Sequence, residues 1–145
     1  MNLPSIKDYV MFLSDLLCIT PPEIKYTDTL LTKSQLAMME TSSEVCVLHL
    51  KNGLRDFMVY FAISHEMRHL YQFYNNETIF ESYMRADQTN KDLYNRQPAE
   101  IDANAFALIC MSNFFGVEPN LKEVFNEDII QLIKKRAKEI IDEFK

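Results

Sequence analysis

The chain has 145 residues and a formal net charge of -6 at pH 7, with 48% hydrophobic and 25% charged residues. This length suits one domain with its own core, and we expect a single domain over residues 1–145. The acidic balance argues against direct nucleic-acid binding, and no run approaches the roughly 20 apolar residues of a membrane span. Cys18, Cys46 and Cys110 are dispersed and form no C-x-x-C pair, which predicts reduced core residues of a cytoplasmic protein.

The N-terminal part of the chain predicts one helix and then a small sheet. Ser5 can cap the helix together with Asp8, and Pro21 and Pro22 would end it. The segments that follow have the composition of strands: residues 23–29, 36–41 and 44–51. Because only two serines separate the last two segments, we expect them to form a hairpin.

A longer helix is predicted from about Leu54 to about Tyr74, a run that lacks glycine and proline. It contains the pentapeptide H-E-M-R-H. Helical residues four apart share a face, so His65 and His69 can reach a single metal ion while Glu66 points beside it. This spacing is typical of zinc hydrolases, in which zinc lowers the pKa of a bound water. Glu66 can then take the proton of that water as a general base.

The region after this helix is expected to be polar and irregular before it becomes helical again. Between residues 77 and 97 a short helix is plausible near the start, whereas residues 87–96 resemble a loop. Pro98 suits the first turn of a helix over residues 99–115, and Gly116 is a natural stop.

A third ligand is needed, because catalytic zinc takes three protein ligands and leaves one position for water. The remaining histidine, His49, lies in a predicted strand, and the cysteines lack ligand spacing, so a carboxylate is the best donor. The candidate is Glu100, near the start of the helix over residues 99–115. Ala103 and Ala107 share its helical face and would allow close approach of another helix.

Other polar residues could support such a site. Asn104, one turn from Glu100, could hold a ligand by a hydrogen bond. Asp102 lies on another side of the helix and is a weaker ligand candidate, or a partner of a histidine N–H. Donors for the oxyanion stay open among five residues: Tyr71, Tyr74, Tyr83, Tyr94 and Arg96.

Two segments together carry a family resemblance: H-E-M-R-H at 65–69 and E-I-D-A-N-A-F-A at 100–107. They resemble the gluzincin metallopeptidases and are most similar to the ImmA/IrrE family, over about residues 36–115. The resemblance implies Glu100 as the third ligand of Zn²⁺. It also implies a small zincin-like α+β domain, mostly helical, with a short antiparallel sheet or hairpin packed on the motif helix.

Three positions bear on this assignment. Arg68 stands where the family commonly has glycine, so the helix contact that glycine allows is altered here. Metzincins need glycine and histidine at the positions of Gln72 and Asn75, which excludes that class.

The expected function is that of a zinc-dependent metallopeptidase, which hydrolyses peptide bonds of an intracellular protein or peptide through a zinc-activated water. The alternative is a non-catalytic regulatory or binding protein that retains a zincin fold, with a regulatory protein as its partner. The intact Glu66 argues against it. A third hypothesis is a metal-free interaction domain whose working surface is an amphipathic C-terminal helix, expected at about residues 126–144 with Asn126 as its cap.

Overall fold

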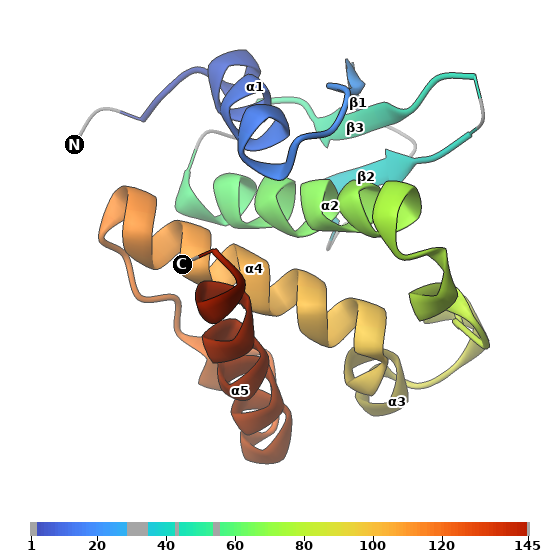
Figure 1. Ribbon diagram of the computed structural model, residues 1–145, viewed down its shortest axis with the longest axis vertical. Coiled ribbons are helices and arrows are strands. Elements are labelled where there is room, and N and C mark those ends of the chain that lie inside the picture. Colours follow the sequence, from blue (N-terminus) through green and yellow to red (C-terminus); the bar gives the residue numbers. More distant parts are fainter. Residues whose placement is uncertain (1–2, 29–34, 43, 54–55, 145) are drawn as a thin grey trace. The chain divides into compact units, whose positions relative to one another are not determined.

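The computed structural model describes residues 3–28, 35–42, 44–53 and 56–144 (Figure 1). These residues form five α-helices, three strands and three short 3-10 helices, which confirms the expected α+β class. The chain divides into two compact units, Met1–Asn75 and Asn76–Lys145, and each is described by itself. The single domain over residues 1–145 stays a prediction. No helix of the described residues is both long enough and apolar enough to cross a membrane.

The first helix, α1 (Ile6–Leu17), begins at the predicted cap and ends earlier than expected. The Ser5 hydroxyl accepts a hydrogen bond from the backbone N–H of Asp8 at 3.1 Å. The helix ends at Cys18, whose φ of 55° places it in the left-handed region, before the two prolines are reached. The Cys18 side chain is exposed, so the prediction that it is a core residue is wrong.

The sheet contains β1 (Glu23–Thr27), β2 (Ala37–Glu40) and β3 (Val47–Lys51), in the order β1-β3-β2. The predicted hairpin is confirmed, because β2 and β3 pair antiparallel. The expected short antiparallel sheet or hairpin is limited to this pair, because β1 pairs parallel with β3 and makes the sheet mixed. Four of the five residues of the central strand β3 are buried, as expected of a strand covered on both faces.

The motif helix, α2 (Phe57–Asn75), packs against α1 and β2. Figure 1 shows α1 and the strands along one side of it. A hydrogen bond between two buried hydroxyls joins α1 to α2, because the hydroxyl oxygens of Tyr9 and Ser64 lie 2.6 Å apart. The predicted helix start at Leu54 lies outside the described residues. Apolar side chains of the first unit that are almost fully buried come from α1, β3 and α2: Val10, Leu13, Leu48, Leu50, Val59, Tyr60, Ile63, Met67 and Leu70.

The second unit begins with the 3-10 helix Glu77–Phe80, near the place where a short helix was expected. The prediction of a loop over residues 87–96 is wrong, because α3 (Lys91–Arg96) forms there. The Asn90 side chain caps α3 by accepting the N–H of Leu93 at 2.9 Å. A six-residue polar helix has too few turns to show an apolar period, so its cap is the signal that could have identified it.

The two long helices of the second unit are α4 (Pro98–Phe115) and α5 (Glu127–Glu143), which pack on each other. As predicted, Pro98 opens α4, and Gly116 ends it with a φ of 65°. Asn126 occupies the N-cap of α5, but its amide donates to the Asp92 carboxylate at 2.9 Å instead of capping the helix. The apolar stripe predicted for this helix is buried at five positions: Ile129, Ile130, Ile133, Ala137 and Ile140. The prediction is wrong for its last two members, Ile141 and Phe144, which are exposed.

Candidate metal centre

The first unit brings the two predicted histidine ligands together on α2. The Nε2 atoms of His65 and His69 lie 3.1 Å apart, and both rings are half-buried. Two imidazoles that bind one zinc ion at 2.0–2.1 Å in tetrahedral geometry have their nitrogens about 3.3 Å apart. The observed separation therefore fits two nitrogens that share one ion. Because the spacing comes from one helical turn, α2 provides it without help from another element.

The other ring nitrogen of His69 also has a defined neighbour. Its Nδ1 lies 2.8 Å from the side-chain oxygen of Gln72, three residues further along α2. The Gln72 side chain is buried, with 1% of the residue exposed. Sequence reasoning used Gln72 only to exclude the metzincins and did not identify this contact.

Glu66 is held in place by the neighbouring sheet. Its Oε1 accepts a hydrogen bond from the backbone N–H of Met39 at 2.8 Å, and its Oε2 lies 3.8 Å from His65 Nε2. Met39 belongs to β2, an outer strand of the described sheet. The predicted general base therefore stands beside one histidine with one oxygen anchored to a strand. A backbone donor such as the Met39 N–H leaves no residue-type signal, so sequence reasoning missed it.

Glu100 lies in the second unit, in the first turn of α4, and is buried with 2% of the residue exposed. The Tyr83 hydroxyl donates to its Oε2 at 2.8 Å, and the oxygens of Tyr83 and Tyr94 lie 3.2 Å apart. Burial raises the pKa of the Tyr83 hydroxyl well above its usual value, and the negative charge of Glu100 raises it further. Tyr83 therefore stays protonated and keeps donating to the carboxylate at neutral pH.

Two other candidate residues of the second unit, Asp102 of α4 and Arg96 of α3, form ion pairs within that unit. Asp102 accepts a hydrogen bond from Arg136 Nε of α5 at 2.7 Å, an ion pair that joins the two helices. Asn104 is buried with 4% of the residue exposed. Arg96, one of the candidate oxyanion donors, forms ion pairs with Asp92 at 2.8 Å and with Asp128.

Two other candidate donors lie on α2 with neighbours in the first unit. The Tyr74 hydroxyl lies 3.6 Å from the Cys46 thiol, and this contact is the main cause that raises the pKa of Tyr74. The Tyr71 ring lies under the guanidinium of Arg68, with 4.4 Å between the guanidinium carbon and the ring centroid. Arg68 is buried, with 2% exposed, so it is part of the packed helix face.

The third histidine, His49, is buried in the central strand β3. Its Nε2 lies 2.9 Å from the Glu40 carboxylate, across the hairpin. Its Nδ1 is buried and has no hydrogen-bond partner among the described residues. His49 therefore lies in a strand, as expected, and the expectation that it is not a ligand stays a prediction.

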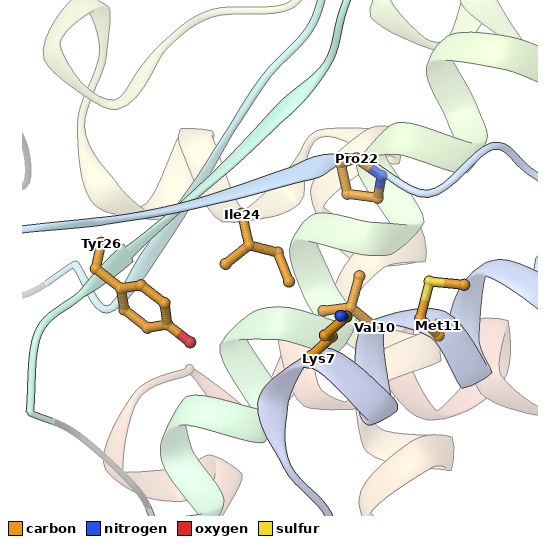
Figure 2. Close-up of a pocket in the computed structure, with 6 residues that line it drawn as sticks. All are labelled: Lys7, Val10, Met11, Pro22, Ile24 and Tyr26. Atoms are coloured by element: carbon orange, nitrogen blue, oxygen red, sulfur yellow. The ribbon is translucent and has the colours of Figure 1, made fainter.

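A separate hollow of about 410 Å³ lies between α1 and β1 in the first unit. In Figure 2, the side chains of Ile24 and Tyr26 extend from the strand and those of Lys7, Val10 and Met11 lie on the helix side. Among the residues that the structure describes, the lining, completed by Pro22, contains no histidine, cysteine or carboxylate. The hollow therefore does not include His65, Glu66 or His69.

In chemical terms, His65, His69 and Glu100 are a donor set that could hold a metal ion. No family model, no curated protein and no solved structure matches this chain. The likeness to the ImmA/IrrE family therefore stays a prediction from the two motif segments.

Proposed function

We propose that this protein is a zinc-dependent metallopeptidase with a zincin-like fold. In this proposal His65 and His69 of the first unit and Glu100 of the second unit bind one zinc ion, and Glu66 is the general base. The observation that carries the proposal is the arrangement on α2, where two Nε2 atoms face each other at 3.1 Å beside an anchored glutamate. A structural metal site has no use for that glutamate.

The choice of metal rests on the donor types and on Glu66. Two imidazoles and one carboxylate suit zinc in a catalytic site, with one position left for water. The same donor set also occurs with iron in oxygenases. A carboxylate beside the ligands, such as Glu66, favours hydrolysis, because hydrolysis requires a group that removes a proton from water.

The proposed chemistry divides between the ion and Glu66. When bound, zinc supplies a water of lowered pKa and polarises the scissile carbonyl. Glu66 Oε2 accepts the proton of that water and later delivers it to the leaving amine. The Met39 N–H holds Oε1, so the carboxylate keeps its orientation through both transfers.

The proposed substrate is an extended segment of an intracellular protein or peptide. As an outer strand of the described sheet, β2 can pair with an added strand through backbone groups other than the Met39 N–H, which Glu66 occupies. The same strand holds Glu66 through Met39, so a peptide aligned along β2 would lie close to the general base.

The test compares the parent with Glu66→Gln and, as a matched control, Glu77→Gln at an exposed position just after α2. We expect one zinc ion per chain in all three proteins, measured by elemental analysis. Hydrolysis of a fluorescently labelled unfolded protein should fall by about 10²- to 10⁴-fold in Glu66→Gln alone. Absence of zinc from the parent, or equal cleavage by Glu66→Gln, would refute the proposal. Zinc binding without any cleavage by the parent would favour the non-catalytic alternative.

A further inference from the structure

We propose that Gln72 is a positioning residue that holds the His69 imidazole in the tautomer with its proton on Nδ1. In this tautomer the lone pair of Nε2 is available to a metal ion before any ion binds. This inference rests on the proposed function for the identity of the ligand, but the tautomer is a property of the metal-free protein.

The contact is short and comes from within one helix. The Gln72 side-chain oxygen lies 2.8 Å from His69 Nδ1, and residues three apart are neighbours on a helix surface. An amide oxygen can only accept a hydrogen bond, so Nδ1 must carry the proton. A neutral imidazole has one N–H, which leaves the Nε2 of His69 with a lone pair.

Burial protects the hydrogen bond between Gln72 and His69 from competition by water. Gln72 is 1% exposed, so bulk water does not readily replace its carbonyl oxygen. The Nε2 of His69 faces His65 Nε2 at 3.1 Å, which is the side where both rings would bind one ion. The Gln72 contact on Nδ1 therefore directs the lone pair of His69 toward that side. Removing such outer partners of a metal ligand typically lowers metal affinity by about 10- to 100-fold.

The competing explanation is that the hydrogen bond to His69 only compensates the burial of the Gln72 amide and has no effect on the tautomer. A matched control for this explanation is Ser64→Ala, which removes a buried hydroxyl of α2 bonded to Tyr9 and to the Tyr60 carbonyl. Loss of a purely structural hydrogen bond should lower the unfolding midpoint and leave the histidine tautomer unchanged.

The experiment uses the full metal-free chain with ¹⁵N-labelled histidine, and long-range ¹H–¹⁵N NMR spectra at about pH 8, above the usual histidine pKa of about 6.5. The chain has 3 histidines, so His49 and His65 variants assign the signals. We expect the parent and Gln72→Glu, which keeps an acceptor oxygen, to have the His69 proton on Nδ1. Gln72→Met, which has no such acceptor, should show mixed tautomers.

Zinc titration of the same proteins gives the second readout. Affinity should fall by about 10- to 100-fold in Gln72→Met, recover most of the parent value in Gln72→Glu, and stay at the parent value in Ser64→Ala. A parent spectrum with the His69 proton on Nε2 would overturn the inference, as would a folded Gln72→Met variant with the parent's tautomer and affinity. If Gln72→Met does not fold, the parent and Gln72→Glu spectra decide. A parent that binds no zinc contradicts the proposed function, and its tautomer still decides the role of Gln72.

Discussion

The two units hold their proposed metal donors by different means. In the first unit, His65, His69 and Gln72 all come from one helix, and a single strand contact orients Glu66. In the second unit, Glu100 is held by Tyr83, which lies 17 positions earlier in the chain, outside α4. The first arrangement follows from helical spacing, whereas the second depends on the path of the chain between Tyr83 and α4. Donors of the first kind can be recognised in a sequence, and partners of the second kind cannot.

The largest effect is expected from removing a donor from either unit. His69→Ala and Glu100→Gln should each abolish stoichiometric zinc binding, because a catalytic zinc site uses three protein ligands. Zinc content after dialysis measures the loss, and His49→Ala, which removes a histidine of β3, is the control. If Glu100→Gln binds zinc as well as the parent while His69→Ala does not, the ion belongs to the first unit alone.

Core substitutions in each unit should have the next largest effect and test the single-domain prediction. Leu13 and Ile133 are both fully buried, one in α1 and the other in α5. Replacing either by alanine should lower the free energy of unfolding by about 2–5 kcal/mol. Urea unfolding followed by circular dichroism and tyrosine fluorescence should show one shared transition for both variants. Two separate transitions, each sensitive to one variant, would contradict a single domain over residues 1–145.

Tyr83→Phe should weaken zinc binding by about 10- to 100-fold, because it removes the hydroxyl that holds Glu100 Oε2. Calorimetric titration of zinc measures the change. Tyr26→Phe makes the same substitution at an exposed position of β1 and should leave the affinity unchanged. Equal affinities of the parent and Tyr83→Phe would show that the second unit does not need this contact to present Glu100.

The smallest effect is expected at the ion pairs of Arg96. Hydrogen bonds from Arg96 hold the pKa values of the Asp92 and Asp128 carboxyls below their usual range. Carboxyl groups with a lowered pKa stabilise the folded state above their unfolded pKa of about 3.9 and lose this contribution as pH falls from there through the lower folded-state pKa. Arg96→Met should therefore lower the urea midpoint at pH 7 slightly, and the difference from the parent should be smaller at about pH 3 than at pH 7.

Lys135→Met is the control for this substitution, because Lys135 is an exposed cation of α5. It should leave the urea midpoint close to the parent value at both pH values. A difference between Arg96→Met and the parent that is as large in acid as at pH 7 would assign the effect of Arg96 to its packing and not to its charge.

Much of the helical framework could be predicted from short-range patterns. Ser5 capped α1 as expected, and Pro98 and Gly116 bounded α4, because caps and breakers act on neighbouring backbone groups. The predictions that failed involve either weak local signals or distant partners. The six residues of α3 are too few to show a helical period of apolar residues. The parallel pairing of β1 with β3 depends on the path of the chain between the two strands, which local sequence does not specify.

For the candidate site, the sequence by itself determined the spacing of His65, Glu66 and His69, because a helix turns every 3.6 residues whatever surrounds it. It also identified Glu100 as a candidate by its residue type and its place in a second motif. Only the tertiary structure decided which groups hold these side chains: the Met39 backbone for Glu66 and the Tyr83 hydroxyl for Glu100. The physical reason is that both contacts join segments distant in sequence, where neither periodicity nor residue type specifies the partner.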